Sequence, residues 1–383
     1  MANSKFDVIV VGAGVFGSWS AYFLQRVGRR VLLLDAYGPA SSRASSGGET
    51  RIIRMGYGPD EVYTKWSQRS LPLWKELQER AGTTLFHRTG VLWMASEGDA
   101  YAAAIVEVLK RCGIHAEEID ERELARRYPQ IRFDEGTRGI LETESGTLMA
   151  RRGVQTVAAE FVKVGGEYRM EKVKAPSGSG RVREIETESG ARYSADVFVF
   201  ATGSWLPKIF PDLLGDRIFV TRQEVLFFGV PAGVSDFAPP KMPTFLDRTG
   251  AFYGIPDLEN RGLKVADDDH GAKVDPDTQE RVVSEGAVKK ARAYLAKRFP
   301  SMKDAPLVEA RVCQYENSSS GDFLIDRHPE FENVWLVGGG SGHGFKHGPA
   351  LGQYVSERVS GHGEVDEKFA LRTKERVQKR AIF

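Results

Sequence analysis

The chain has 383 residues, which is too long for one simple core and predicts two domains, or one large core with an insertion. Its 53 lysines and arginines nearly balance 52 aspartates and glutamates, so the charge gives no support for a nucleic-acid partner. Two cysteines do not make a disulfide framework and favour a reducing compartment. Without a signal-peptide pattern or an apolar run of the ~18 residues that a membrane span needs, we expect a soluble, cytoplasmic protein that has no membrane partner.

The first forty residues predict a strand, a turn, a helix and a second strand. Residues 6–11, FDVIVV, form a continuous apolar run, which is typical of a strand covered on both faces. The glycines of GAGVFG follow, and a segment with helical spacing, SWSAYFLQRV, runs to Gly28. A second apolar strand, RRVLLLDA, reaches Asp35 near its end.

This arrangement predicts a dinucleotide-binding site. Gly12 permits a tight turn, Gly14 lets the backbone approach a pyrophosphate, and Gly17 allows a helix to pack closely on a strand. The helix N-terminus attracts phosphate, and Asp35, 23 residues after Gly12, can accept hydrogen bonds from a ribose hydroxyl. A chance glycine turn is the alternative, and the acidic residue at the end of the next strand disfavours it.

The motif alone leaves the identity of the dinucleotide open. FAD-binding proteins usually add a late strand and glycine turn that return to the cofactor, and two segments fit this description. Residues 195–205, ADVFVFATGSW, run into Gly203, and residues 333–345, NVWLVGGGSGHGF, run into a glycine cluster. Each segment alone could be an ordinary strand end. Together with the first motif they predict a discontinuous nucleotide-binding domain with other segments inserted into it.

The rest of the chain carries weaker signals. Residues 60–80 have helical spacing, with Asp60 as a possible N-cap, Gly82 as the stop, and a kink or break expected at Pro72. An antiparallel sheet suited to a substrate domain is predicted from alternating stretches such as VRVREIETESGARYSADVFVF, VTRQEVLFFGV and GAFYGIPD. The last twenty residues mix both signs of charge and predict a solvated helix or tail.

Four basic residues stand out from ordinary surface charge by their context. Arg51 and Arg54 lie three apart in GGETRIIRMGYG, after a loop of small residues, and Lys264 lies in a strand-like segment. Lys346 directly follows the late glycine cluster, the kind of loop where α/β proteins bind ligands. An arginine together with a lysine is suited to capture a substrate carboxylate, because arginine can donate to both oxygens.

Other chemistries fit the sequence poorly. His343 and His347 are four apart, but a metal pair at that spacing normally needs a helix, which the neighbouring glycines and proline oppose, so we expect no metal site. The segment GGSGHG does not match the nucleophile elbow of serine hydrolases. Cys112 is expected to be a small packed residue, whereas Cys313 could be a packed residue, a redox thiol or an attachment point.

Four motifs together resemble the FAD-dependent amine oxidases of the monomeric sarcosine oxidase group, within the D-amino-acid-oxidase-like superfamily. Relatives in this group include N-methyltryptophan, pipecolate and fructosyl-amino-acid oxidases. The motifs span residues 6–349 and are GAGVFG with LLLDA, GGETRIIR, GLKVADDDHGAKVDPD, and VCQY followed by GDFLIDRHPEFENVWLVGGGSGHGFKHGP.

The resemblance implies an α/β plus antiparallel β fold. A Rossmann-type FAD-binding domain would carry an inserted, mainly antiparallel substrate domain. On this basis we expect the FAD-binding domain to comprise residues 1–83, 150–218 and 310–383, and the substrate-binding domain to comprise residues 84–149 and 219–309.

The resemblance also implies roles around the cofactor. Cys313 would be bonded through its sulfur to the 8α-carbon of the flavin, so that FAD is covalently held. Lys264 would hold a water near flavin N5 and supply positive charge for the reaction with O₂. Arg51 would lie against the isoalloxazine ring, and the helix that begins at Pro349 would point its positive end at the flavin and favour the anionic reduced form.

The remaining expected cofactor contacts lie in the glycine motifs and the small-residue loop. The full set expected to bind the cofactor is Gly12, Gly14, Gly17, Asp35, Ser45, Thr50, Arg51, Gly203, Cys313, Gly340, Gly342, Gly344 and Lys346. For the substrate, the resemblance implies that Arg54 and Lys346 bind a carboxylate and that Tyr253 lines the cavity.

Two departures from the sarcosine-specific members concern the substrate. An aromatic residue and a histidine are replaced here by the acidic run Asp267, Asp268 and Asp269, and two histidines before Thr50 are replaced by Ser46 and Gly47. An acidic cavity with smaller residues, in which Asp268 would take part, predicts a substrate larger or more basic than sarcosine. A solvated loop is the alternative for the aspartates.

The implied reaction oxidises the C–N bond of an amino acid or an N-substituted (N-methyl, cyclic or glycated) amino acid to an imine and reduces O₂ to H₂O₂. The cofactor would supply the chemistry, and the protein orientation and charge. The expected partners are therefore a small amine and O₂, with the chain acting as a monomer. The alternatives are a dehydrogenase of the same fold that passes electrons to a quinone or protein, a non-catalytic flavoprotein subunit, and an NAD-dependent dehydrogenase.

Overall fold

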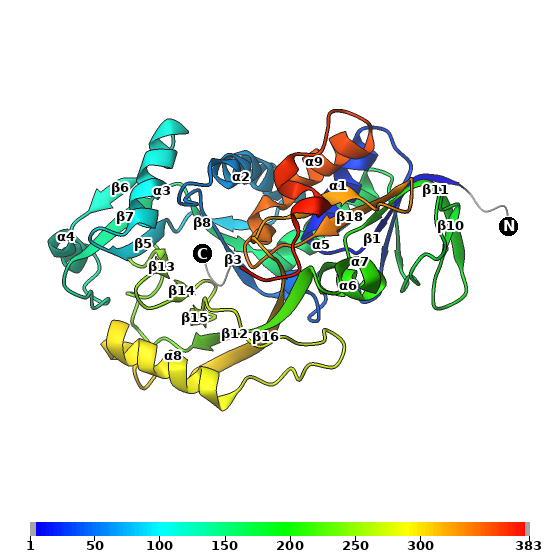
Figure 1. The fold of residues 1–383 in the computed structure, drawn as a ribbon. Helices are drawn as coiled ribbons and strands as arrows, with labels where there is room; N and C mark the ends of the chain where they lie inside the picture. Colours follow the sequence, from blue (N-terminus) through cyan, green and yellow to red (C-terminus); the bar gives the residue numbers. More distant parts are fainter. Residues whose placement is uncertain (1–4, 380–383) are drawn as a thin grey trace.

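The computed structural model describes residues 5–379, whose strands form three sheets surrounded by helices (Figure 1). The first sheet has the order β17-β18-β11-β1-β2-β9, with β10 paired to β11. Strands β1, β2, β9, β11 and β18 run parallel, whereas β10 and β17 are antiparallel to their neighbours. The bounds are β1 (Phe6–Val11), β2 (Val31–Asp35), β9 (Glu167–Met170), β10 (Glu184–Glu186), β11 (Arg192–Phe200), β17 (Leu324–Arg327) and β18 (Val334–Gly338).

Alternate residues of β1 enter two different hydrophobic cores, because successive side chains of a strand point to opposite faces. Val8 and Val10 pack in the core that contains Trp19 of helix α1, and Ile9 packs in the core that contains Leu206. Burial of both faces confirms the prediction made for residues 6–11. The helices of this part are α1 (Val15–Arg26), α5 (Ala150–Lys163), α6 (Leu206–Ile209), α7 (Pro211–Leu214) and α9 (Gly348–Val359).

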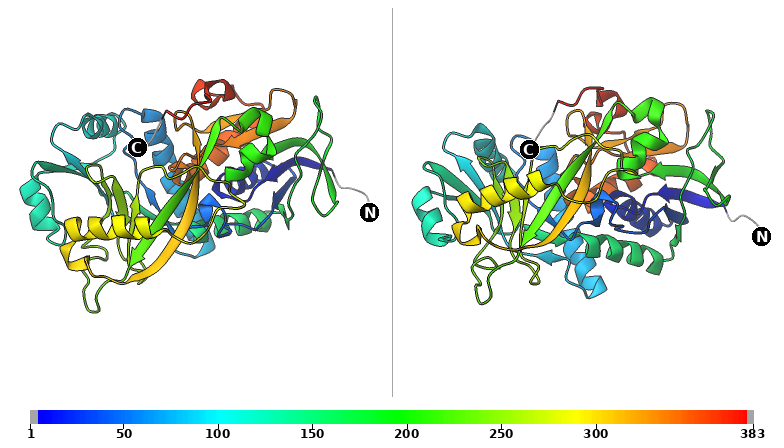
Figure 2. Two further views of the ribbon diagram at one scale, coloured as in Figure 1. Left: turned by 60° about the horizontal axis from the view of Figure 1, so that its bottom comes forward. Right: turned by 90° about the horizontal axis from the view of Figure 1, so that it is seen from below.

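The second sheet is antiparallel except at one pair and has the order β16-β12-β15-β14-β13-β5-β7-β6. Its bounds are β5 (Val91–Ser96), β6 (Glu117–Ile119), β7 (Thr137–Glu142), β12 (Ile218–Phe228), β13 (Thr244–Asp247), β14 (Phe252–Ile255), β15 (Leu263–Asp267) and β16 (Leu307–Ser318). Helix α8 (Glu285–Arg298) packs on this sheet, as Figure 2 shows. A mixed fold with a largely parallel and a largely antiparallel sheet was expected and is confirmed.

A small third sheet has the order β3-β8-β4. Its strands come at the points in the sequence where the chain passes from one large sheet to the other. Its bounds are β3 (Thr50–Ile53), β4 (Phe86–His87) and β8 (Gly146–Met149). The remaining helices are α2 (Glu61–Ala81), α3 (Ala100–Arg111) and α4 (Glu121–Arg127), with short 3-10 turns η1 (Ser45–Gly47), η2 (Gly203–Trp205), η3 (Pro300–Met302), η4 (Gly344–His347), η5 (Glu367–Phe369) and η6 (Leu371–Thr373). Within residues 5–379, no helix is long and apolar enough to cross a membrane.

Helix α2 corrects one expectation and confirms another. It continues through Pro72 without a break, since residues on both sides, among them Leu71 and Trp74, anchor the helix in the core. Gly82 ends it with a left-handed backbone, φ 61°, as predicted for the stop. Asp60 occupies the N-cap position, but its side chain makes no capping hydrogen bond.

Two further stretches differ from expectation. The residues of β11 form a central strand of the first sheet and not part of an antiparallel substrate sheet, because parallel pairing with β1 and β18 buries them. The C-terminal segment is less solvated than its charge pattern indicated. Phe369 is buried against Trp66 and Phe323, and the side chain of Lys374 is also buried. Residues 380–383 of the predicted tail lie outside the described part.

A buried ion pair joins α8 to the antiparallel sheet. Arg298 donates from Nε to Asp247 at 2.8 Å, and the two side chains are 2% and 0% exposed. Asp247 also accepts from the hydroxyl of Tyr294, at 3.0 Å, and Arg298 reaches the half-exposed Asp134, at 3.1 Å. The desolvated charges are tolerated because each one is paired and hydrogen-bonded.

Replacing Asp247 by alanine should lower the free energy of unfolding by about 3–5 kcal/mol, because it leaves the Arg298 charge buried without its main partner. Urea unfolding followed by circular dichroism measures the change. Asp134→Ala is the control: its carboxylate is 43% exposed, so its loss should cost less than about 1 kcal/mol. Equal losses for the two variants would show that burial of the pair does not matter.

Candidate functional site

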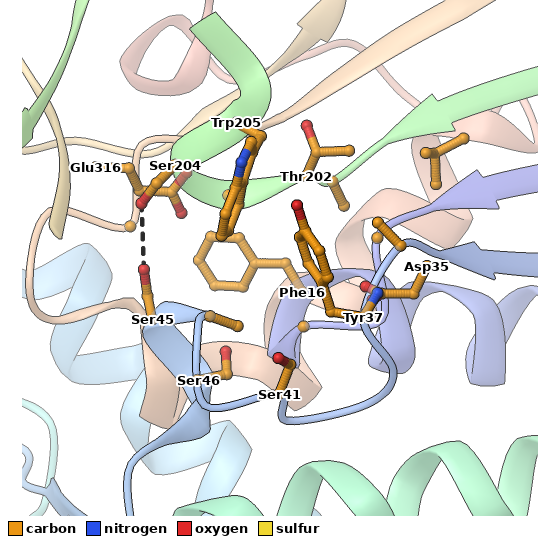
Figure 3. Close-up of a pocket in the computed structure, with 18 of the residues that line it drawn as sticks. Phe16, Asp35, Tyr37, Ser41, Ser45, Ser46, Thr202, Ser204, Trp205 and Glu316 are labelled. Atoms are coloured by element: carbon orange, nitrogen blue, oxygen red, sulfur yellow. Dashed lines mark hydrogen bonds between the residues drawn. The ribbon is translucent and has the colours of Figure 1, made fainter. Parts of the chain in front are cut away.

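A cavity of about 470 Å³ opens beside the C-terminal ends of β1, β2 and β11 (Figure 3). In Figure 3, Asp35 and Tyr37 lie on one side of it and Ser45, Ser204 and Glu316 on the other. Most of the residues expected to bind a cofactor line it, although they come from distant parts of the chain: Gly12, Gly14, Asp35, Ser45, Arg51, Gly203, Gly340, Gly342 and Gly344. Gly17, Thr50, Cys313 and Lys346 are not in its lining.

The three glycines of the first motif occupy the environments that their predicted tasks require. A Cβ on Gly12, whose φ is 107°, would overlap the carbonyl oxygen of Ala201, and a Cβ on Gly17 would overlap that of Gly12. A Cβ on Gly14 would meet only Ser46 Oγ, at 3.5 Å. The protein itself therefore leaves the space beside Gly14 open, on the wall of the cavity, where a ligand can approach the backbone.

The N-terminus of α1 faces this cavity and is held by one side chain from η1 and one from the end of β2. Ser46 Oγ accepts from the N–H of Val15 at 3.1 Å, and Asp35 Oδ2 accepts from the N–H of Ala13 at 2.6 Å. Burial raises the pKa of Asp35, opposed by the N–H donors of Ala13, Tyr37 and Gly38. Sequence reasoning missed this contact of Ser46, since it lies 31 positions after Val15 and gives no local signal.

Cys313 lies next to Arg51 in a narrow cavity that adjoins the larger one. Arg51 Nη2 is 3.6 Å from Cys313 Sγ and donates to the carbonyl oxygen of Ser45 at 2.7 Å. Lys264 lines the same narrow cavity, and its Nζ donates to the carbonyl oxygen of Thr50 at 3.0 Å. Strand pairing makes this grouping possible, because β12 pairs on one edge with β15 and on the other with β16.

Lys264 is almost fully buried, which changes its protonation. Its Nζ lies 5.9 Å from the ring centre of Phe227 and 5.6 Å from that of Tyr253. Burial holds the pKa of Lys264 well below its ordinary value, and the neighbouring Arg51 charge lowers it further. Negative charge formed beside the amine would favour its protonated form.

The three aspartates do not share one environment. Asp267 and Asp269 both pair with Lys290 of α8, at 3.3 Å for Asp269, which agrees with the alternative of a solvated loop for these two residues. Asp268 differs, since its charge contributes to the raised pKa values of Tyr253 and Tyr315. Burial is the larger cause for both tyrosines and raises the pKa of Tyr253 to about 12.

Arg54 and Lys346, 292 positions apart in the chain, meet at one tyrosine. The Arg54 guanidinium lies 4.1 Å from the ring centre of Tyr57 and 4.8 Å from that of Trp93. Lys346 Nζ donates to Tyr57 Oη at 2.7 Å and to the carbonyl oxygen of His343 at 3.0 Å. Sequence reasoning missed Tyr57, although it stands in the quoted GGETRIIRMGYG segment.

The two histidines of the late glycine cluster belong to this group. Tyr57 Oη is 2.7 Å from His347 Nε2 and 3.3 Å from His343 Nδ1. Burial, together with the charges of Lys346 and Arg54, holds the pKa of His347 well below its ordinary value, so the imidazole is neutral. Among residues 5–379, no three His, Cys, Asp or Glu side chains are grouped so that they could hold a metal ion.

Glu142 fixes the loop that carries Arg54. Its Oε2 accepts from the N–H of Met55 at 2.6 Å and from Ser145 Oγ at 2.5 Å. Its Oε1 accepts from the N–H of Gly56 at 2.9 Å and from Trp93 Nε1 at 2.8 Å. Arg54 in turn donates to the carbonyl oxygen of Gly56. One buried carboxylate therefore holds both the loop and the indole that surround the guanidinium.

The larger cavity fits an anionic dinucleotide such as FAD. The N–H groups at the start of α1 and the open space beside Gly14 suit a pyrophosphate, and Asp35 retains lone pairs for a ribose hydroxyl. Two buried side-chain oxygens in the lining, Oγ1 of Thr202 and Oε2 of Glu316, have no hydrogen-bond partner within the described residues. Such a group is expected where a ligand completes the hydrogen bonding.

Comparisons with known proteins agree with this geometry. A family model described as FAD dependent oxidoreductase matches residues 7–358. Monomeric sarcosine oxidase from Bacillus sp. is 33% identical over 93% of this chain and 92% of its own length. N-methyl-L-tryptophan oxidase from Salmonella heidelberg is 28% identical over 93% and 95%. The solved structure of fructosyl peptide oxidase from E. terrenum superposes with a TM-score of 0.83, at 22% identity, over 100% of this chain and 96% of that one.

Glu142→Gln should weaken the binding of small carboxylate anions by about tenfold or more, because the amide cannot accept all four hydrogen bonds and the Arg54 loop loosens. Titration of the protein-bound flavin absorbance with such an anion measures the dissociation constant. Glu144→Gln, the same change two residues away at an exposed ion pair with Arg88, should have no effect. A Glu142 variant with unchanged anion binding would contradict this account.

Proposed function

The chain belongs to the family of FAD-dependent oxidoreductases, and we propose that it oxidises the C–N bond of an amino acid or an N-substituted amino acid to an imine while reducing O₂ to H₂O₂. The observation that carries the proposal is the meeting of Arg54 and Lys346 at Tyr57, while Arg51 and Cys313 lie together beside the cavity that fits FAD. Two fixed positive side chains are suited to hold the carboxylate of an amino acid.

Bound FAD would supply hydride acceptance and electron transfer to O₂, which no amino-acid side chain provides. We propose that the residues expected from the motifs hold it, with the N-terminus of α1 at the pyrophosphate and Asp35 at the ribose. The further residues of this proposed set are Gly12, Gly14, Gly17, Ser45, Thr50, Arg51, Gly203, Cys313, Gly340, Gly342, Gly344 and Lys346.

The substrate side of the proposal rests on charge and rigidity. Arg54 and Lys346 bind the carboxylate, and the rings of Tyr57 and Trp93 restrict the guanidinium so that little conformational entropy is lost on binding. Tyr253 lines the substrate space. Asp268, whose charge acts on Tyr253, attracts a basic group and favours a substrate larger or more basic than sarcosine.

In this proposal Lys264 takes part in the reaction of the reduced flavin with O₂. Burial holds the pKa of its amine well below the ordinary value, and negative charge that develops nearby favours the protonated form. A protonated Nζ stabilises that charge in a site of low dielectric. Before that, Nζ is available to hold a water molecule, since the carbonyl oxygen of Thr50 uses only one of its protons.

Cys313 is the proposed covalent anchor of the flavin. A thioether would replace the S–H of Cys313 and one C–H of the 8α-methyl group by a C–S bond, and O₂ would take up the two electrons and two protons as H₂O₂. The position of Cys313 Sγ, 3.6 Å from Arg51 Nη2 and in a cavity that adjoins the larger one, supports this assignment.

A division into two domains is supported by the two large sheets, which take most of their strands from different parts of the chain. We propose that residues 1–83, 150–218 and 310–383 bind FAD and that residues 84–149 and 219–309 bind the substrate. The chain acts as a monomer in the cytoplasm in this proposal, because the near balance of charge and the two free cysteines indicate neither a nucleic-acid partner nor an oxidising compartment.

Acid precipitation should leave the yellow colour in the pellet, and mass spectrometry should find the FAD mass on the peptide that contains Cys313. Cys313→Ser should release free FAD into the supernatant because a hydroxyl cannot form the thioether. Cys112→Ser is the matched control and should keep the cofactor attached. Free FAD released from the unaltered protein would end the covalent proposal.

A peroxide assay over sarcosine, other N-methyl, cyclic imino, glycated and basic amino acids tests the reaction. We expect stoichiometric H₂O₂ with at least one carboxylate-bearing amine. Lys264→Met should slow the reoxidation of the anaerobically reduced protein by O₂ about 10²-fold, since Nζ no longer stabilises the developing charge.

Stopped-flow absorbance after mixing with O₂ measures this rate. Lys290→Met, which removes a lysine that pairs with Asp267 and Asp269, is the control and should reoxidise normally. Slow reoxidation of the unaltered protein with little H₂O₂ would favour a dehydrogenase that uses another acceptor, and no bleaching by any amine would favour a non-catalytic flavoprotein.

A further inference from the structure

Glu316 is a buried acid in the wall of the larger cavity that the motifs do not account for. It lies on β16, three residues after Cys313, and is 7% exposed. Its Oε2 has no hydrogen-bond partner within the described residues. Figure 3 shows its carboxyl group beside Ser204, on the opposite side of the cavity from Asp35.

Backbone without side chains surrounds this carboxyl group. A Cβ on Gly340 would lie 3.2 Å from Oε1, and a Cβ on Gly338 would lie 3.5 Å from Oε2. A Cβ on Gly203 would be 3.8 Å from Oε2. The late glycine cluster and the turn after β11 thus leave space that the acid and a ligand can share. Side chains at these glycines would fill that space, which explains part of the glycine content of the two segments.

The other carboxylates of the cavity lining have partners. Asp35 accepts from backbone N–H groups, Asp277 pairs with Lys208, and Glu188 pairs with Lys172 at 2.7 Å. For Glu316, by contrast, no cation among the described residues lies within salt-bridge distance, and Oε2 accepts from no donor. Burial raises its pKa to about 8, opposed by the N–H groups of Gly340 and Gly339, so the acid is neutral at pH 7.

A neutral carboxyl group is both a donor and an acceptor. The backbone N–H groups of Gly340 and Gly339 donate to this carboxyl group. The part that lacks a partner is therefore the O–H of the neutral acid, which needs an acceptor. FAD presents oxygen and nitrogen acceptors along the ribityl chain and the flavin ring and carries negative phosphates. An ionised Glu316 would lose the donor and repel those phosphates.

We propose that Glu316 holds FAD as a neutral acid, donating from Oε2 to an acceptor of the flavin and ribityl part of the cofactor. The location follows from the fold: the pyrophosphate belongs at α1, and Cys313 lies roughly 10 Å back along the extended strand. This inference rests on the proposed function, because that assigns the cavity to FAD. It adds a pH-dependent contact that the family motifs do not contain.

The charged groups that face the cavity from other elements do not explain such a pH dependence by themselves. Hydrogen bonds with Glu188 raise the pKa of Lys172, and those with Asp275 and Asp277 raise the pKa of Lys208. Lys174 pairs with Glu186. The tyrosines Tyr37 and Tyr315 complete the titratable lining, and burial holds the pKa of Tyr315 well above its ordinary value.

The test uses the Cys313→Ser protein, which should bind FAD reversibly, with fluorescence titration of FAD between about pH 6 and 10. The dissociation constant should be flat below the pKa of Glu316 and then rise towards tenfold per pH unit, because only the neutral acid binds and that form is lost as the pH rises. Adding Glu316→Gln should abolish the rise, since an amide keeps a donor at every pH. Adding Glu316→Ala should weaken binding at all pH values.

Identical pH slopes for the Cys313→Ser protein with and without Glu316→Gln would overturn the inference while leaving the proposed function intact. If the Cys313→Ser protein is folded, as cooperative unfolding would show, but binds no FAD at any pH, the proposed function itself would be contradicted. A second readout uses the intact holoenzyme: infrared spectroscopy at pH 7 should show a protonated carboxylic acid band that Glu316→Gln lacks. Absence of that band from the unaltered holoenzyme would also overturn the inference.

Discussion

The close packing of α1 between β1 and α9 is the constraint on which the site depends. Gly17 lets α1 approach the turn at Gly12, and Gly352 lets α9 approach the backbone of Trp19, where a Cβ would lie 2.6 Å from its carbonyl carbon. These contacts bring the start of α1 and the loop before α9 to the same cavity, although more than 300 residues separate them in the chain. Larger side chains at these glycines would separate the two halves of the site.

The positively charged side chains at this site contact backbone carbonyl oxygens and aromatic rings. Lys264 donates to a carbonyl oxygen, Arg51 donates to two, and the rings of Tyr57 and Trp93 surround Arg54. The nearby carboxylate Glu142 accepts from four donors that hold the loop and the indole around Arg54. Carbonyl oxygens and ring faces thus help to hold these side chains in place.

Local sequence patterns were reliable where a backbone requirement selects the residue type. Gly12, Gly17 and the stop at Gly82 are of this kind, since left-handed or crowded positions admit few residues. Pro72 shows the converse. Its local tendency to break a helix was overridden by packing on both sides, and the charged C-terminal segment was anchored by one phenylalanine, Phe369.

By itself the sequence determined that a dinucleotide site exists and which residues lie near its glycine turns. It also showed that nearly the whole chain resembles a family of amine oxidases. The tertiary structure alone decided which distant side chains meet: Tyr57 joins Arg54 to Lys346, Lys290 pairs with Asp267 and Asp269, and Oε2 of Glu316 faces the cavity with no partner among the described residues. The physical reason is that side-chain contacts between strands depend on sheet order and register, and these are set by burial over the whole fold.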